Sequence, residues 1–188
     1  MTNSILITGI TDLDCYPNSG LCRNYKQNMF SNTLCIPSAK PDIESINEIK
    51  IDIDIEEFKV INSILGPKLS IYGCVSVKII YTADNCQQSV HSAHWNKPFC
   101  DFVLLKDLSY DVCKNLIIKV FIGIEDVCIK YFNKRVVDLS ILYVICPQII
   151  VSNTSNYCDK HSRYDDSNSY SSNEGWGYKQ NIYSNFKK

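Results

Sequence analysis

Isoleucine alternates with charged residues in the clearest stretch of the chain, "EIKIDIDIEEF". Ile49, Ile51, Ile53 and Ile55 share one face of an extended strand, and charged side chains share the other face. A period of two is typical of a strand with one buried face and one face in water. We therefore predict a half-buried β-strand, and we interpret its acidic face as solvated rather than catalytic.

Similar patterns continue from about residue 43 to residue 151. A turn at Gly66 and Pro67 leads into a segment with Val75, Val77 and Ile79 on its core face. No amphipathic helix of 10 to 15 residues separates the strand-like segments, which argues against a parallel β-α-β sheet. The pattern predicts an all-β fold, an antiparallel β-sandwich or partly open barrel, with a short helical turn at "LSYDVCKN". The later predicted strands, separated by polar breaks that include "NKP", are "SVHSAHW", "PFCDFVLL", "NLIIKVFIGIEDVCIKYF" and "RVVDLSILYVI".

The two ends of the chain differ from this central region. Residues 1–40 are rich in Asn, Ser and Gly and contain the turn signal "YPNSG", so we predict a flexible, cysteine-bearing N-terminal arm. Residues 41–151 would form the β domain. Residues 152–188 are polar and rich in tyrosine with almost no aliphatic side chains, which predicts a flexible tail.

Composition narrows the class of partner. The chain has 188 residues, 45% of them hydrophobic, and a net charge of -1, which gives no bulk attraction to nucleic acid or to an anionic membrane. No apolar run approaches the roughly 18 residues that span a bilayer, and the N-terminus lacks the features of a signal peptide. We expect neither nucleic acid nor membrane as a partner, and synthesis in the cytosol.

One segment carries candidate metal or catalytic chemistry, with Cys86, His91, His94 and Cys100 in that order. The spacing is not a common structural-zinc spacing, and two histidines three residues apart point to opposite faces of a strand. No phosphate loop, nucleophile elbow or metalloprotease motif occurs in the chain. We expect no enzyme activity, cofactor or metal site, with a metal-dependent enzyme or metal store as a rival.

Ten cysteines are dispersed along the chain without any C-x-x-C pair. Cys146, at the end of "ILYVIC", is the best candidate for a core position. At least six of the others fall in the arm, the tail or the polar face of a strand, where burial is unexpected and crosslinking between subunits is the natural use. The candidate crosslinking residues are Cys15, Cys22, Cys35, Cys74, Cys86, Cys128 and Cys158.

From Ile36 to Pro147 the chain resembles the SPOCS domain family of spore coat and exosporium proteins, which includes SipL. The most specific pieces are "KPDIE", the strand from Gly73 to Tyr81, "PF" at Pro98 and Phe99, and "IED". The chain departs from SipL-type proteins in lacking a LysM module and in its ten cysteines. In this respect it is closest in character to cysteine-rich exosporium proteins that self-assemble.

The resemblance implies a structural protein of the bacterial endospore surface, in the exosporium or coat. It would be made in the mother-cell cytosol without a signal peptide and would polymerise with itself into a lattice or fibre reinforced by intersubunit disulfides. Its partners would be its own copies and other spore coat or exosporium proteins. The alternative is a non-polymerising adaptor that docks to another coat morphogenetic protein. Arm exchange, or strand addition at an open sheet edge, would join the subunits.

Overall fold

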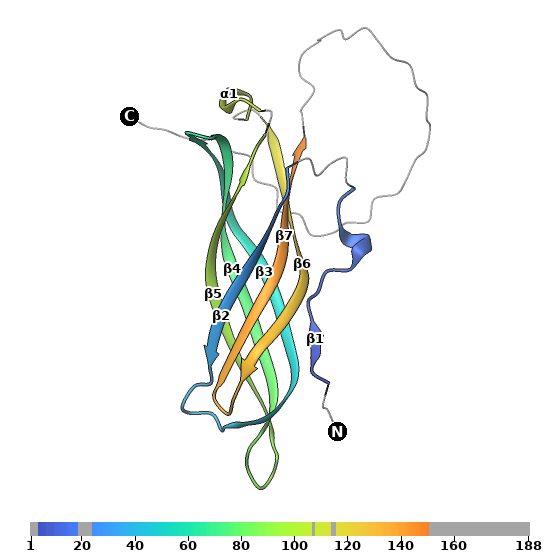
Figure 1. Cartoon of the computed structure of the whole chain (residues 1–188), viewed down its shortest axis with the longest axis vertical. Coiled ribbons are helices and arrows are strands. Elements are labelled where there is room, and N and C mark those ends of the chain that lie inside the picture. The colour runs from blue at the N-terminus through green and yellow to red at the C-terminus, as the bar shows by residue number, and fades with distance from the viewer. Residues whose placement is uncertain (1–3, 19–23, 107, 114–115, 151–188) are drawn as a thin grey trace.

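A computed structural model describes residues 4–18, 24–106, 108–113 and 116–150 (Figure 1). Strands make up nearly all of the regular structure, and the strands are long. In chain order the elements are β1 (Leu6–Thr8), the 3-10 turn η1 (Leu13–Cys15), β2 (Lys26–Cys35), β3 (Ile43–Ser63), β4 (Gly66–Ala83), β5 (Val90–Leu104), α1 (Tyr110–Cys113), β6 (Ile117–Phe132) and β7 (Val136–Ile150).

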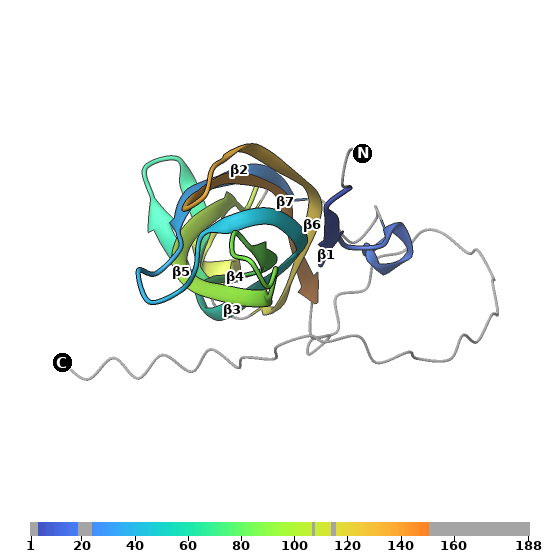
Figure 2. The ribbon, with the colours of Figure 1, turned by 90° about the horizontal axis from the view of Figure 1, so that it is seen from below.

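The strands form two sheets, one with the order β1-β3-β4-β5 and the other with the order β2-β7-β6. Seen from the end, the sheets curve around a common core (Figure 2). Every pair of neighbouring strands is antiparallel except β1 with β3. The prediction of an all-β antiparallel sandwich is therefore confirmed.

Alternating side chains of both sheets fill the core. The four isoleucines of the "EIKIDIDIEEF" segment are 0 to 8% exposed, as their pattern predicts, and Val75, Val77 and Ile79 beside them are at most 1% exposed. From the other sheet, Leu139 and Ile141 are at most 1% exposed. These residues hold the sheets together because burying an aliphatic side chain contributes about 1.5–3 kcal/mol.

Strand β5 corrects one prediction from the sequence. The "NKP" segment was expected to break the chain between two strands, but Asn96, Lys97 and Pro98 continue one uninterrupted strand. Because β5 lies at the edge of its sheet, a proline without an N–H group need not interrupt the ladder. The result is a 15-residue edge strand that pairs with β4 along its whole length.

Strand β2 lies in the region that the sequence analysis assigned to the arm. It pairs with all ten residues from Val136 to Ile145 of β7, so residues 26–35 form an integral strand of the second sheet. The alternation was easy to miss because two of its inward positions are asparagines, Asn28 and Asn32, and Leu34 alone is fully buried. The predicted tail, residues 152–188, lies outside the described residues.

The predicted helical turn at "LSYDVCKN" is present as α1, a single turn of four residues. Its last residue, Cys113, is 1% exposed and belongs to the core. Within the residues described, no helix has the length and apolar character needed to cross a membrane.

We predict that Gly73→Ala lowers the free energy of unfolding by about 1–3 kcal/mol, the range for forcing an extra carbon into a packed site. A Cβ at Gly73 would lie 2.1 Å from the backbone oxygen of Asp54, at a register shift of β3, so the backbone would have to move. Lys78→Ala, at an exposed site of the same strand, is the control and should change stability by less than about 0.5 kcal/mol. Chemical denaturation of both variants checks this, and equal stabilities would contradict it.

Candidate assembly surfaces

Two cysteines lie close together on the outer face of the β3-β4-β5 sheet. Cys74 alternates with the buried core residues of β4, and Cys100 is exposed on β5. Tyr72 is the register partner of Cys100, and Pro98 is the partner of Cys74. The two cysteines are therefore diagonal neighbours, whose Cα atoms in such a pair are about 7–8 Å apart. They form a small thiol-bearing patch that faces away from the core.

The opposite outer face carries Cys128 on β6 and Cys35 at the end of β2, both exposed. Cys128 is the register partner of Ser140 on β7, whose hydroxyl lies 2.6 Å from that of Ser31 on β2. A small polar side chain thus lies next to Cys128 on β7, and a second one follows on β2. Because they leave the thiol accessible, a neighbouring molecule could approach it across this face.

Two further cysteines lie outside the sheets. Cys15 is exposed in η1, and Cys86 is exposed in the turn between β4 and β5. Cys22 and Cys158 lie outside the described residues. Of the candidate crosslinking cysteines that the structure describes, four are exposed and Cys74 is half-buried, and their crosslinking stays a prediction.

Buried cysteines include the one that the sequence indicated and one that it missed. Cys146 is 2% exposed, in agreement with its predicted core position. Cys113 is also buried, and burial raises the pKa of its thiol. A four-residue helix is too short to show a periodic pattern, so the sequence carried no signal for this burial.

The suspected ligands between residues 86 and 100 do not converge. Cys86 lies in the turn, and Cys100 follows His91 by nine positions of extended strand, a span of about 30 Å at 3.3 Å per residue. The Nε2 atom of His91 lies 2.9 Å from the hydroxyl of Ser89, and its ring packs 6.0 Å from that of Tyr81. Within the described part of the chain, no group of three or more His, Cys, Asp or Glu side chains could hold a metal ion.

A buried carboxylate links the two sheets where β5 faces β2. Asp101 of β5 is 4% exposed and accepts hydrogen bonds from Lys26 Nζ at 2.5 Å and Asn28 Nδ2 at 2.9 Å, both on β2. The hydroxyl of Tyr143 on β7 donates a third hydrogen bond at 3.0 Å, and the backbone N–H of Phe102 donates a fourth at 2.7 Å. Side chains thus replace the backbone ladder that is absent between these two edges.

The network shifts the pKa values of the Asp101 carboxyl and the Tyr143 hydroxyl. Burial alone would raise the pKa of Asp101, but the hydrogen bonds from Lys26, Asn28, Phe102 and Tyr143 outweigh it and hold this pKa below its usual value. Burial, and then the nearby carboxylate, raise the pKa of the Tyr143 hydroxyl far above its ordinary value. Asp101 is therefore charged and Tyr143 neutral at physiological pH.

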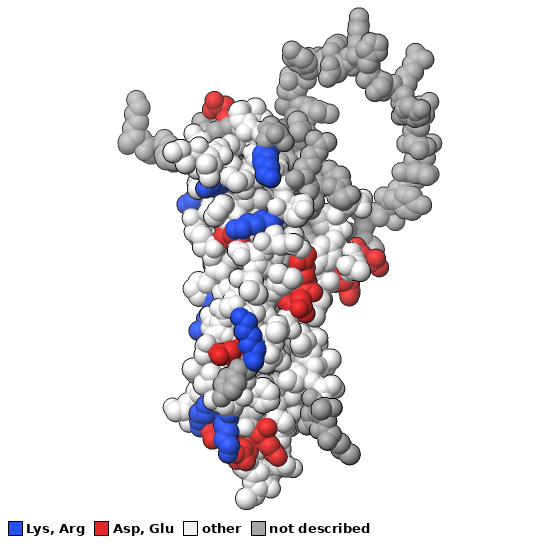
Figure 3. All heavy atoms as spheres, in the orientation of Figure 1, with Lys and Arg blue, Asp and Glu red and all other residues white. Residues whose placement is uncertain are grey.

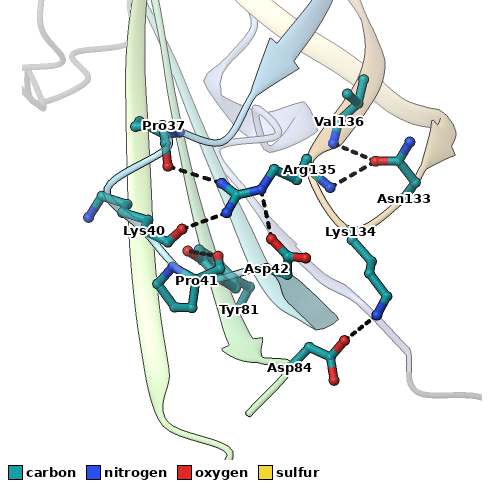
Figure 4. Close-up of polar contacts among 10 residues, drawn as sticks. All are labelled: Pro37, Lys40, Pro41, Asp42, Tyr81, Asp84, Asn133, Lys134, Arg135 and Val136. Atoms are coloured by element: carbon teal, nitrogen blue, oxygen red, sulfur yellow. Dashed lines mark hydrogen bonds and ion pairs between the residues drawn. The ribbon is translucent and has the colours of Figure 1, made fainter.

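At one end of the sandwich, Arg135 ties the β6-β7 turn to the connection between β2 and β3 (Figure 4). Its guanidinium donates hydrogen bonds to the backbone oxygens of Pro37 at 3.2 Å and Lys40 at 3.1 Å and pairs with Asp42 at 2.7 Å. The adjacent Lys134 pairs at 2.5 Å with Asp84, beside the β4-β5 turn. These contacts join three connections into one end of the molecule and set the positions of the nearby thiols in the turn and at the end of β2.

Lysines and aromatic rings surround Cys100. Lys26 Nζ lies 4.3 Å and Lys68 Nζ 4.6 Å from the ring centre of Phe102, and Lys59 Nζ lies 5.2 Å from that of Tyr72. Both rings are partly exposed, so apolar contact area and lysine ammonium groups lie together on this sheet, beside the acidic register partners Asp54 and Glu57. On the face seen in Figure 3, both signs of charge are spread along the molecule and neither forms a continuous field.

Residues 42–131 match the family model described as the SipL SPOCS domain. The chain carries a SPOCS domain. This agrees with the resemblance identified in the sequence and assigns a spore-associated role. No curated protein and no solved structure shows significant similarity to the chain.

The matched SPOCS region runs from the start of β3 almost to the end of β6. Strands β2 and β7 lie outside it, yet β7 is the central strand of its sheet and β2 supplies two of the donors to Asp101. The folded unit that contains the SPOCS domain is therefore larger than the matched region. The exposed cysteines of the matched region are Cys86, Cys100 and Cys128, and Cys74 is half-buried.

We predict that Asp101→Asn lowers the free energy of unfolding at pH 7 by about 2–3 kcal/mol. The change removes the charge that pairs with Lys26 and replaces one of the two acceptor oxygens by an amide group that donates instead of accepting. The folded-state pKa of Asp101 is depressed, so its contribution is present above the unfolded pKa of about 3.9 and is lost as the pH falls through the lower folded value. The variant should therefore lose less stability than the wild type below about pH 4.

Chemical denaturation between pH 2 and 7 measures this difference, with Asp54→Asn at an exposed site as the control. Parallel stability profiles for the wild type and Asp101→Asn would show that the network does not hold the carboxylate in its charged form.

Proposed function

We propose that this protein is a structural, self-assembling component of the bacterial endospore surface, in the exosporium or coat. Its partners are its own copies and other proteins of those layers. The observation that carries the proposal is the distribution of exposed thiols over both outer faces and one end of a sandwich with a SPOCS domain. A spore-associated family supplies the setting, and the thiols supply the means of linkage.

The distribution of thiols determines what kind of assembly can form. A subunit linked at two points builds a chain, whereas a subunit linked at three or more separated points builds a sheet or network. Cys74 and Cys100 point away from one sheet, Cys128 points away from the other, and Cys86 lies at the end. Links in at least three directions are therefore available, which favours a lattice over a linear fibre.

The proposed timing follows from thiol chemistry. Subunits made in the reducing mother-cell cytosol assemble through weak contacts with their exposed cysteines as thiols. After the mother cell lyses, each pair of thiols loses two protons and two electrons to an oxidant such as molecular oxygen, and one S–S bond forms. This step requires Cα atoms about 4.4–6.8 Å apart, so the lattice first positions the pairs and oxidation then fixes them.

The adaptor alternative has one structural feature in its favour. The β3-β4 hairpin ends in Ile64, which is fully exposed, and Leu65, which is 72% exposed. An apolar hairpin tip of this kind suits insertion into a pocket of a different protein. A stoichiometric complex with another coat morphogenetic protein, formed without homopolymers, would support that function instead.

We predict that the purified protein forms sheets or networks that electron microscopy resolves. Oxidation should turn them into species that run as a ladder on non-reducing gels and collapse to monomer with reductant. Light scattering before and after oxidation measures the size of the assemblies. A protein that remains monomeric both before and after oxidation would contradict the proposal.

Replacing the cysteines of one outer face at a time should show which face carries the links between subunits. We predict that Cys74→Ser with Cys100→Ser removes links through one face and thins the ladder, and that adding Cys128→Ser reduces it further. Replacing Cys15, Cys22 and Cys35 together tests the N-terminal segment in the same way. Cys113→Ala, which removes a buried thiol, is the control and should leave the ladder unchanged. A full ladder in every variant would move the crosslinks to other cysteines.

A further inference from the structure

The N-terminal segment closes the side of the sandwich opposite the Asp101 network. Strand β1 pairs in parallel with β3, with Leu6 opposite Glu48 and Thr8 opposite Lys50. Ile5 and Ile7 pack against the core, whereas Leu6 between them is 57% exposed. Although β1 has three residues, it is a strand with one apolar face, and it covers part of the free edge of β3 (Figure 2).

Beyond β1 the chain crosses to β6 in the other sheet. The backbone N–H of Thr11 donates to the oxygen of Ile124 at 2.8 Å, and the N–H of Ile124 donates to the Thr11 hydroxyl at 2.9 Å. The ring of Tyr16 packs edge-on against Phe121 with centres 5.4 Å apart. Ile124 lies at a register shift of β6, where the ladder with β7 is interrupted. Residues 4–16 therefore bridge an edge of each sheet.

Gly9 restricts which sequence can occupy the position of this bridging segment. Its φ angle is +107°, and a Cβ at this position would lie 1.9 Å from the backbone oxygen of Ile51. A residue other than glycine would therefore meet both backbone strain and a collision with β3. The fitting sequence has apolar residues at positions 5 and 7, glycine at 9 and threonine at 11.

We propose that the edges of β3 and β6 form a peptide-binding site whose ligand is residues 4–16 of a second copy of this chain. The segment touches the rest of the molecule through residues far away in sequence: its partner Glu48 is 40 positions from Thr8, and Ile124 is 113 positions from Thr11. None of these contacts depends on the covalent link to β2. The same contacts can therefore form between two chains, as in strand exchange.

The length of the connection sets the reach of this exchange. Residues 17–25, nine positions in the sequence, separate the bridging segment from β2 and can extend over at most about 30 Å. The inference rests on the proposed self-assembly, because neighbouring subunits in a lattice supply the arms at high effective concentration. An arm passed from each subunit to the next makes an open, head-to-tail contact that continues instead of closing. It also carries Cys15 onto the neighbouring subunit.

A disulfide trap between full-length chains tests the exchange. One chain carries Thr8→Cys and the other Lys50→Cys, which are paired in register, and the exposed native cysteines of both chains are replaced by serine. The two chains are mixed, unfolded and refolded together, and then oxidised, with a mass tag on one of them. A covalent heterodimer forms if the arm of one chain lies on β3 of the other.

The controls use the same strand pair. Asp54→Cys, four residues further along the same face of β3, should give at least tenfold less heterodimer with Thr8→Cys. Gly9→Val added to the Thr8→Cys chain should also reduce the yield at least tenfold. If circular dichroism shows that either trap variant fails to fold, the pair Leu6→Cys and Glu48→Cys reports the same register.

The double variant Thr8→Cys with Lys50→Cys, in one chain, tests whether the arm instead stays on its own subunit. If this chain forms an internal disulfide while the mixed single variants give no heterodimer, each arm stays on its own subunit and the exchange is overturned. Wild-type sheets in electron microscopy without a trapped heterodimer would leave self-assembly standing and exclude this route. A trapped heterodimer without any sheets would support exchange and contradict the lattice.

Discussion

The sandwich depends on how its open sheet edges are closed. Two sheets that do not join into a barrel expose unpaired N–H and C=O groups, which invite pairing with other chains. The protein meets this constraint differently on its two sides: the charged Asp101 network bridges β5 and β2, and the N-terminal segment bridges β3 and β6. One side is closed by side chains of the sheets themselves, and the other by a separable piece of backbone.

In strands with an open edge, a side-chain oxygen accepts a hydrogen bond from a neighbouring backbone N–H at three positions. The side chains of Asp101, Asn28 and Asp52 each accept a hydrogen bond from the backbone N–H of the next residue, at 2.7, 2.9 and 3.0 Å. All three residues lie in strands with at least one unpaired stretch of edge. A satisfied N–H is a poorer template for non-specific pairing, so association is directed toward the contacts that the molecule provides.

The sequence predicted the strands that bury one face and missed the interactions between distant segments. The isoleucines of β3 predict their strand because alternation is a local property. Strand β2 was not predicted because asparagines occupy two of its interior-facing positions. The role of Asp101 depends on Lys26 and Tyr143, 75 and 42 positions away, and no local pattern encodes such a meeting. The positions of the cysteines were predicted in part, because alternation located Cys74 and Cys128 on outer faces but left Cys113 unassigned.

Oxidation and folding must be compatible in a protein with ten cysteines. The thiolate is the reactive form of cysteine, so burial, which raises the pKa of Cys113, lowers its reactivity as well as its access to oxidant. The exposed thiols lie on strands and turns whose positions are set by the core and by the Arg135 contacts, so forming bonds there does not require the core to open. A fold that keeps its reactive thiols outside can be crosslinked in the assembled state without passing through an unfolded one.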